Sequence, residues 1–296
     1  MEKLIFACFS SGKDFSAVLW AASIRKFAGS LSNSSIWVII PDSKNSLNKD
    51  VEDELISLDV NTVNVESDLK IRKFPFAEYV KAVATTESLA VKKSEFLVWM
   101  NSDTLILNEP IDFILDEGKN LGFRPVHHTL IGSIYSEPID PFWELIYQKC
   151  HVSDDKIFPM KTHVDHNILR PYFNAGFLIV RQKMGLLQAW WDKFKGLYKD
   201  SAFQAFYEKN EIYTIFIHQA ILAGVILSQM EKLQLQELSF AYNYPLHLYA
   251  ESPAEYQPKN LNELVTVRYE DTNILKEARF HEPHYSWISQ YLKRYF

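Results

Sequence analysis

Apolar residues recur along the first half of the chain in short continuous runs, which longer amphipathic segments separate. The runs at residues 4–9, 36–40 and 96–100 are rich in aromatic and branched aliphatic side chains, as buried strands are. Between the first two runs, residues 15–27 carry apolar side chains at helical spacing, and the second run ends at the turn signal Pro41-Asp42. Strands that alternate with helices predict an α/β protein with a mainly parallel sheet flanked by helices.

Further strands and helices follow with the same two periodicities. After residue 241 the chain is richer in Pro and Tyr and loses periodicity, so we expect loops and short strands that fold back over the first half. No internal repeat, low-complexity tract or Gly/Ser linker divides the chain, which predicts a single domain over residues 1–296. The predicted strands are residues 60–65, 121–125 and 173–180, and the predicted helices are residues 51–58, 75–90, 142–150 and 184–197.

The longest apolar stretch is residues 213–227, interrupted by His218 and Gln219. It is shorter than the roughly 20 residues that a membrane span requires, so we predict a buried helix and no transmembrane segment. The first residues enter a strand-like run after two charged side chains, without the apolar length of a secretion signal. We therefore expect a cytoplasmic protein.

Composition narrows the classes of partner and cofactor. With 47% hydrophobic and 23% charged residues, the chain has the composition of a globular protein. A formal net charge of -6, with no block of Lys or Arg, argues against nucleic acid as the main partner. Because Cys8 and Cys150 are the only cysteines, neither a disulfide framework nor a thiolate zinc cluster is expected.

A small polar cluster, Asn101, Ser102 and Asp103, follows the apolar run at residues 96–100. Ligands of open α/β sheets bind beyond the carboxyl ends of the strands, where this cluster would lie. A carboxylate there can bind a hard cation such as Mg²⁺ or Mn²⁺, which would neutralise a diphosphate. The same residues can form an Asx turn that ends a strand, so the pattern alone leaves both interpretations open.

Four short segments, in this order, resemble motifs of GT-A-fold glycosyltransferases, particularly the glycogenin-like retaining group. The strand with Asn101-Ser102-Asp103 resembles the D-x-D segment: Asp103 matches the second carboxylate, whereas Asn replaces the first. Asn174-Ala-Gly176 resembles the Asn-Ala/Ser-Gly segment that precedes a core strand of that family, and His218-Gln219 lies where the family commonly has Asp-Gln. Residues 280–287 resemble the C-terminal His…Lys-Pro-Trp segment, with His281 as the His and no Lys.

The resemblance implies a GT-A-like, Rossmann-type fold and a glycosyltransferase that moves a sugar from a nucleoside diphosphate sugar to an unknown acceptor, with retention of configuration. The nucleotide-binding half would be about residues 1–125, and the sugar and acceptor half with a C-terminal flap about 126–296. A divalent metal, Mn²⁺ or Mg²⁺, would be held by Asp103 and His281. The residues that contact the donor would be Asn101, Ser102, Asp103, Gly176 and Lys13. Lys13 belongs to the loop 10–14, which would receive the base. The catalytic residues would be Asn174, His218 and Gln219.

The departures from the family motifs leave two alternatives open. Asn101, His218 and the missing Lys are compatible with a catalytically weakened protein of the same fold that binds a nucleotide sugar or glycan. Residues 161–166, Lys-Thr-His-Val-Asp-His, resemble the H-x-H-x-D-H motif of the metallo-β-lactamase fold with its first His replaced, which would indicate a metal-dependent hydrolase. The glycosyltransferase interpretation requires Asn174 and Gln219 to face one cavity.

Overall fold

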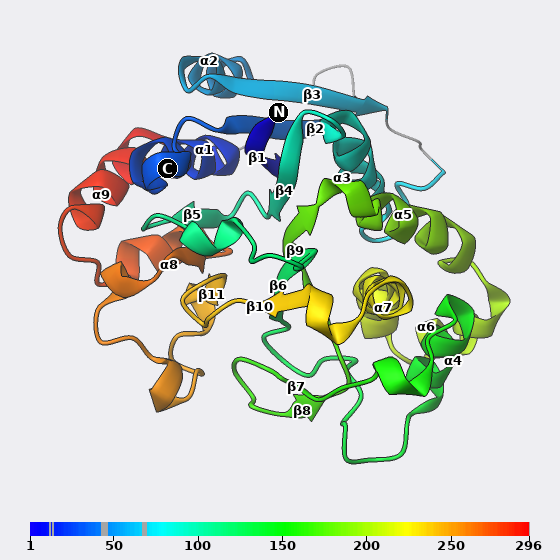
Figure 1. The fold of residues 1–296 in the computed structure, drawn as a ribbon. Helices are drawn as coiled ribbons and strands as arrows, with labels where there is room; N and C mark the ends of the chain where they lie inside the picture. The colour runs from blue at the N-terminus through cyan, green and yellow to red at the C-terminus, as the bar shows by residue number, and fades with distance from the viewer. Residues whose placement is uncertain (12, 14, 43–46, 67–69, 296) are drawn as a thin grey trace.

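A central sheet of seven strands organises the molecule (Figure 1). The computed structural model describes residues 1–295 except 12, 14, 43–46 and 67–69. In sheet order the strands are β10 (Leu235–Glu237), β6 (Leu121–Pro125), β9 (Phe173–Arg181), β4 (Ser94–Met100), β1 (Glu2–Phe9), β2 (Ser35–Asp42) and β3 (Val60–Glu66). The strands β4, β1, β2 and β3 pair in parallel, whereas β9 runs antiparallel to both β4 and β6.

Successive residues of the central strands point to opposite faces of the sheet, and both faces are buried. In β1, Leu4 and Phe6 pack into one hydrophobic cluster, while Ile5 and Ala7 pack into another. All four side chains are fully buried. Because helices cover both faces, these strands appear in the sequence as continuous apolar runs rather than as an alternation of apolar and polar residues.

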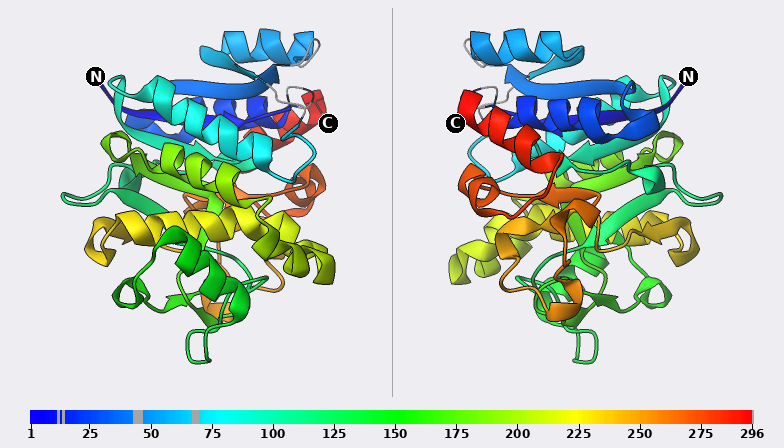
Figure 2. Two further views of the ribbon diagram at one scale, coloured as in Figure 1. Left: turned by 90° about the vertical axis from the view of Figure 1, so that its right-hand side faces the viewer. Right: turned by 90° about the vertical axis from the view of Figure 1, so that its left-hand side faces the viewer.

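Helices cover the sheet on two sides and give three layers (Figures 1 and 2). One side carries α1 (Ser16–Phe27) and α2 (Lys49–Ser57), whose buried side chains belong to the same hydrophobic cluster as Leu4 and Phe6. The predicted α/β class with a mainly parallel sheet is confirmed, and every strand and helix that the pattern predicted is present. The other side carries α3 (Ala77–Ala90), α4 (Pro141–Cys150), α5 (Leu186–Leu197) and α7 (Glu211–Gln229), with the short α6 (Gln204–Lys209) beside them.

The helix α7 is long and apolar enough to cross a membrane by length and composition alone. Its residues 217–227 are buried inside the protein, where α7 packs against α4, α5 and β9. The approach to α4 is close at Gly224, where an added Cβ would lie 2.6 Å from the Sγ of Cys150. These are the contacts of a core helix, as the sequence pattern predicted.

The tail beyond residue 241 folds back onto the first half of the chain, as expected. Its strand β12 (Thr266–Arg268) pairs antiparallel with β5 (Thr104–Ile106) and parallel with β11 (Tyr244–Pro245). A second sheet of three strands therefore begins directly after Asp103.

The tail also holds two helices where loops and short strands were expected, α8 (Thr272–Glu277) and α9 (His284–Tyr295). The helix α9 packs on α1, with the Phe27 ring 4.6 Å from the His284 ring and 5.1 Å from the Trp287 ring (Figure 2). Ile288 and Leu292, four residues apart, are buried on its inner face. This spacing is helical, but one buried pair is too short a pattern to predict a helix against a Pro- and Tyr-rich background.

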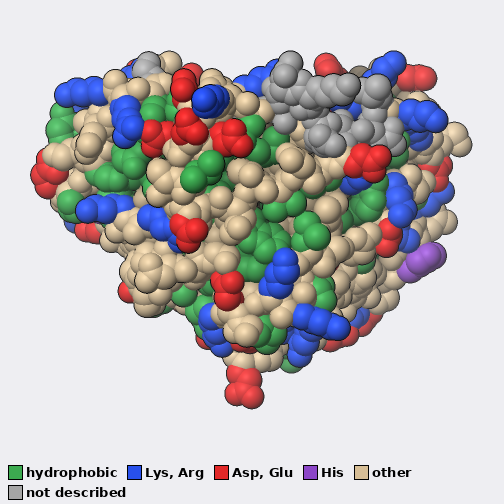
Figure 3. Space-filling view, turned by 90° about the horizontal axis from the view of Figure 1, so that it is seen from above, with side chains coloured by type: hydrophobic (Ala, Val, Ile, Leu, Met, Phe, Trp, Pro, Cys, Tyr) green, Lys and Arg blue, Asp and Glu red, His purple; other side chains and the backbone are tan. Residues whose placement is uncertain are grey.

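The face seen from above carries Lys and Arg side chains next to Asp and Glu (Figure 3). Ion pairs such as Lys3–Glu95 and Arg294–Glu54 join opposite charges between elements. The charge on this face is therefore mixed, unlike the one-signed patch that binds the phosphate backbone of nucleic acids.

Glu87 on α3 is a buried carboxyl group that caps the start of α5. Its Oε2 accepts a hydrogen bond from the Gln188 N–H at 2.8 Å, and the residue is 1% exposed. Burial, partly offset by hydrogen bonds from the backbone of residues 186–188, raises the pKa of Glu87 to about 7. The group therefore keeps its proton in the folded protein at pH values where an exposed Glu is ionised.

We predict that Glu87→Gln makes the protein less sensitive to rising pH. Between pH 4.5 and about 7 the native state holds a proton at Glu87 that the unfolded chain has released, so the free energy of unfolding falls as the pH rises, by on the order of 2–3 kcal/mol. Gln keeps an acceptor for the start of α5 and cannot ionise, so this loss should disappear. Urea unfolding at about pH 5 and about pH 8 measures it; the same pH dependence in both proteins would contradict the raised pKa.

Candidate active site

The carboxyl end of β4 and the amino end of β9 lie side by side, because the two strands are antiparallel neighbours. A cleft of about 320 Å³ opens at this edge of the sheet, the edge at which open α/β sheets bind ligands. Its walls come from α3, α7, the two strand ends, the loop 126–130 and the tail. The residues that line it are Phe76, Tyr79, Asn101, Val126, His127, His128, Leu130, Asn174, Ala175, Gly176, Phe216, His218, Gln219, His247, Leu248, Arg268 and Glu270.

Asn101 follows β4 directly, and its side chain lies over Gly176 of β9. The Asn101 N–H donates to the Gly176 carbonyl at 3.0 Å, which joins the two strand ends. A Cβ at position 176 would lie 2.5 Å from the Asn101 Nδ2, so only glycine lets the amide approach this closely. Gly176 therefore sets the position of Asn101 in the cleft.

Tyr79 on α3, which the sequence analysis missed, holds the Asn101 amide from the other side. Its hydroxyl lies 3.1 Å from the Asn101 Oδ1 and 3.0 Å from the Ala175 carbonyl oxygen, and it accepts a hydrogen bond from the Trp99 Nε1 at 2.6 Å. Burial raises the pKa of Tyr79 well above its ordinary value, so the hydroxyl stays a donor. In the sequence, Tyr79 is indistinguishable from a core aromatic residue of an amphipathic helix.

Asn174 and Gln219 line the same cleft, as the glycosyltransferase interpretation requires. The Asn174 Oδ1 accepts a hydrogen bond from the Gly176 N–H at 3.0 Å, and the Gln219 Oε1 accepts one from the Ala175 N–H at 2.9 Å. The backbone of β9 therefore engages both amide oxygens, which leaves the NH₂ group as the remaining donor of each side chain.

Two histidines of the cleft are buried and uncharged. The His218 ring stacks on Phe76 at 4.2 Å, and its Nδ1 lies 2.8 Å from the Ile215 carbonyl oxygen; this contact needs a proton on Nδ1 and leaves Nε2 as an acceptor. Burial lowers the pKa of His218 to about 4 and that of His127 well below its ordinary value. At neutral pH both rings are therefore neutral hydrogen-bonding groups rather than cations.

Arg268 and Glu270 bring charge into the cleft lining, and Asp103 lies beside them. Arg268 ends β12, where its Nε lies 3.3 Å from the Asp103 Oδ2 and its Nη2 lies 2.9 Å from the Glu270 Oε1. His247 adds an imidazole whose Nε2 lies 3.5 Å from the same Glu270 oxygen. The sequence pattern does not point to Arg268, Glu270 or His247, because the pairing of a three-residue strand is not visible in periodicity.

His281 does not lie in the cleft. It is exposed, its N–H donates to the Asn262 Oδ1 at 3.0 Å, and it lines a separate cavity of about 610 Å³ together with Arg279. The two cavities share His247. The structure therefore separates His281 from the residues with which it was predicted to act.

Three other predicted donor contacts, Asp103, Lys13 and Ser102, also lie outside the cleft lining. Lys13 is exposed in the loop after β1, where its N–H donates to the Ser11 Oγ at 3.4 Å. Gly12 and Asp14 of this expected base-binding loop lie outside the described residues. Ser102 is a half-buried turn residue between Asn101 and Asp103. The predicted residues that the structure brings together at the cleft are Asn101, Asn174, Gly176, His218 and Gln219.

The metal site that the resemblance implies is not assembled by these residues. A divalent metal is common among glycosyltransferases of this fold. Here, however, Asp103 is paired with Arg268, and no three His, Cys, Asp or Glu side chains of the described chain are grouped so that they could hold a metal. The Asp103 Oδ1 is buried without a partner, yet one carboxylate oxygen beside a guanidinium and a neutral amide is a poor ligand set for Mn²⁺ or Mg²⁺.

The segment 161–166 does not form the hydrolase site either. Asp165 accepts hydrogen bonds from the N–H and the hydroxyl of Thr129, both at 2.7 Å, and from the Thr162 hydroxyl. His163 stacks on the Tyr256 ring at 5.1 Å, and burial lowers its pKa to about 3. These contacts hold a turn together, and the metal-dependent hydrolase has no support in the structure.

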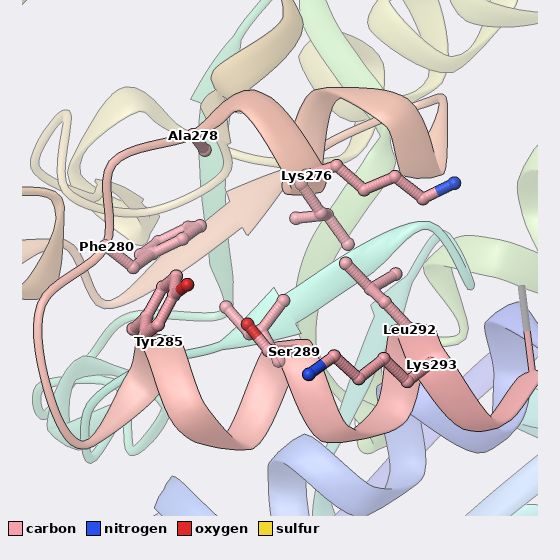
Figure 4. Close-up of a pocket in the computed structure, with 9 residues that line it drawn as sticks. Lys276, Ala278, Phe280, Tyr285, Ser289, Leu292 and Lys293 are labelled. Atoms are coloured by element: carbon pink, nitrogen blue, oxygen red, sulfur yellow. The ribbon is translucent and has the colours of Figure 1, made fainter.

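A further cavity of about 340 Å³ lies between α8 and α9 (Figure 4). Leu275, Phe280 and Leu292 contribute apolar walls, and Lys276 and Lys293 contribute amines. It has no lining residue in common with the cleft, so it is separate from the predicted site.

The fold around the cleft is that of the GT-A glycosyltransferases. The structure is similar to the galactosyltransferase LgtC in complex with donor and acceptor sugar analogs, with a TM-score of 0.50 and 14% identity over 97% of this chain and 99% of that chain. It is also similar to the apo form of mouse xyloside xylosyltransferase 1, with a TM-score of 0.48 and 11% identity over 90% of this chain and 97% of that chain. The similarity to LgtC shows that the fold is of the GT-A type.

The family follows from the sequence. The model of the Rhodobacterales glycosyltransferase domain matches residues 5–228, so the chain belongs to this family and the protein is a glycosyltransferase. No curated protein sequence matches the chain. The matched residues contain Asn101, Asn174 and Gln219, whereas Arg268 lies in the tail beyond them.

We predict that Gly176→Ala lowers activity far more than stability. The new methyl group would displace the Asn101 amide, a movable side chain, so the free energy of unfolding should fall by only about 1–2 kcal/mol. Misplacing a group that positions the substrate should lower the transfer rate roughly tenfold or more. Thermal unfolding and the rate with the accepted donor measure the two effects.

Gly196→Ala is the matched control. Gly196 is exposed on α5 with no atom within 4 Å of an added Cβ, so the change should leave activity unaltered and stabilise the helix by roughly 0.5–1 kcal/mol. Equal activity of both glycine variants would show that the position of the Asn101 amide is unimportant.

Proposed function

We propose that this glycosyltransferase takes its sugar from a nucleoside diphosphate sugar and that the sugar binds in the cleft at the ends of β4 and β9. The support is a set of three amides, Asn101, Asn174 and Gln219, that line this cleft. The oxygen of each amide already accepts a hydrogen bond from Tyr79 or from the backbone of β9. An amide held in this way presents its NH₂ group as an oriented donor, and the hydroxyl oxygens of a sugar are matching acceptors.

Transfer breaks the bond between the anomeric carbon and a diphosphate oxygen, which leaves with the bonding electrons. The acceptor hydroxyl oxygen forms the new bond to that carbon, and its proton passes to water. Groups that stabilise the negative charge of the departing diphosphate lower the barrier. Glu270 is the only carboxylate among the described residues that line the cleft, and it is paired with Arg268, so this lining offers no unpaired carboxylate as a covalent nucleophile.

The Mn²⁺ or Mg²⁺ that the resemblance implies is not part of this proposal. A metal would stabilise the diphosphate by its charge, but the donor set beside Asp103 does not fit one. The protein's own side chains bind the sugar instead. The three amides orient it, and the neutral imidazoles of His127 and His218 form uncharged parts of the cleft wall.

We predict that UDP- or GDP-linked sugars raise the thermal unfolding midpoint. A ligand that binds only the folded state adds roughly 2.7 kcal/mol at a hundredfold excess over Kd. A panel of both nucleotide classes with several sugars, each run beside the free sugar as a control, measures the shift. Absence of any shift across the panel would contradict a nucleoside diphosphate sugar as donor. Slow hydrolysis of the stabilising donor separates an active enzyme from a protein that only binds it.

We predict that Gln219→Glu lowers kcat/KM with the accepted donor by on the order of 10- to 100-fold. The variant keeps an oxygen for the Ala175 N–H, so the fold should remain, but it replaces the NH₂ donor by a second acceptor. Gln229→Glu, at the exposed end of the same helix, is the control and should keep full activity. If both variants keep full activity, Gln219 serves only to hold β9.

A further inference from the structure

Arg268 stands where the metal was expected, beside the carboxylate of Asp103. It ends β12, and the antiparallel register with β5 places it opposite Thr104, the residue after Asp103. The backbone strengthens this contact, because the Tyr269 N–H donates to the Asp103 carbonyl at 3.0 Å. Strand pairing therefore fixes a guanidinium at the Asn101-Ser102-Asp103 turn.

The guanidinium of Arg268 is oriented and still has donors to offer. Its Nε contacts Asp103 and its Nη2 contacts Glu270, and a guanidinium carries more N–H donors than these two contacts use. Its planar fork matches the oxygens of a phosphate group. Arg268 lines the cleft together with Asn101 and Gly176, the residues at the predicted donor site.

The two carboxylates around Arg268 differ in how firmly they are held. The Asp103 side chain is 21% exposed and has its Oδ2 on the Arg268 Nε. The Glu270 side chain is 47% exposed, and its backbone has a φ of 55°, a left-handed conformation that residues with a Cβ rarely adopt. An exposed ion pair contributes little to stability, so a phosphate can replace Glu270 on Nη2 while Asp103 continues to orient Nε.

A metal ion at Asp103 would have to share the site with this guanidinium. The carboxylate oxygen that faces the cation is already occupied, and a dication within a few ångströms of a guanidinium is repelled by it. Asn101 supplies a neutral amide whose oxygen accepts from Tyr79, so it adds no negative charge to offset that repulsion. The second carboxylate nearby, Glu270, is itself paired with Arg268. The charges around Asp103 therefore favour a single cation at this turn, and that cation is the guanidinium of Arg268.

We propose that Arg268 takes the place of the metal ion: it binds the diphosphate of the donor, is oriented by Asp103, and exchanges Glu270 for a phosphate oxygen when the donor enters. This inference rests on the proposed nucleoside diphosphate sugar donor. As the bond to the anomeric carbon breaks, the diphosphate gains negative charge next to a fixed guanidinium. The stabilisation therefore increases toward the transition state.

Calorimetric titration of UDP and of GDP into the full chain, once with excess EDTA and once with Mn²⁺, tests the proposal. Wild type is expected to bind one of the two in EDTA with an affinity within about threefold of that in Mn²⁺. Arg268→Ala should weaken this binding by on the order of 10- to 100-fold, and Arg268→Lys, which keeps the charge but loses the fork, by about tenfold. Arg279→Ala, an exposed cation of the neighbouring cavity, is the matched control and should bind as wild type does.

Glu270→Gln tests the exchange without removing the guanidinium. Because it removes the anion that competes for Nη2, the nucleoside diphosphate should bind several-fold more tightly in EDTA. This variant keeps the Asp103–Arg268 pair, so it remains informative if Arg268→Ala fails to fold. Unchanged or weaker binding by Glu270→Gln would overturn the exchange.

The remaining outcomes separate this inference from the proposed function. Binding that needs Mn²⁺ and is lost in EDTA, or binding that is the same in Arg268→Ala and wild type, overturns the role of Arg268 and leaves the donor class intact. Binding of neither UDP nor GDP under either condition overturns the donor class, and the inference with it.

Discussion

The antiparallel contact between β4 and β9 is the constraint on which the cleft depends. In a wholly parallel sheet the amino end of one strand lies at the opposite edge from the carboxyl end of its neighbour. Here β9 enters the sheet reversed, so Asn174 and Gly176 at its start meet Asn101 at the end of β4. Gly176 closes the distance because it has no Cβ, and Gln219 of α7 bonds to the same stretch of backbone.

The polar groups of the cleft are mostly uncharged and held by other parts of the protein. The amide oxygens of Asn101, Asn174 and Gln219 are engaged, and burial keeps His127 and His218 neutral. Such groups cost little reorganisation when a neutral, hydroxyl-rich ligand enters, because their orientations are set in advance. The charge is concentrated instead at one side of the cleft, at the end of β12.

That side of the cleft is held by the C-terminal tail. Leu105 and Leu107, just after the Asp103 turn, share a hydrophobic cluster with Val267, Tyr269 and residues of α8 and α9. His284, at the start of α9, is buried, and its Nε2 lies 2.6 Å from the Leu107 carbonyl oxygen. The segment 280–287 thus contributes by packing under the site rather than by binding a ligand in the cleft. The pairing of β12 with β5, next to this cluster, places Arg268 opposite Thr104.

The sequence by itself determined six of the seven strands of the central sheet, the helices α1–α5 and α7, and one edge of the site. Strands and helices follow from local burial periodicity, and Asn101, Asn174 and Gln219 lie at ends of predicted elements or on a predicted buried helix, where sheet topology brings them together. The tertiary structure alone decided that Tyr79 holds Asn101, that His281 faces another cavity and that Arg268 meets Asp103. The physical reason is that these contacts join residues far apart in the chain. The pairing of β12 with β5, for example, involves only three residues of each strand, and so short a strand has no periodicity from which its partner could be predicted.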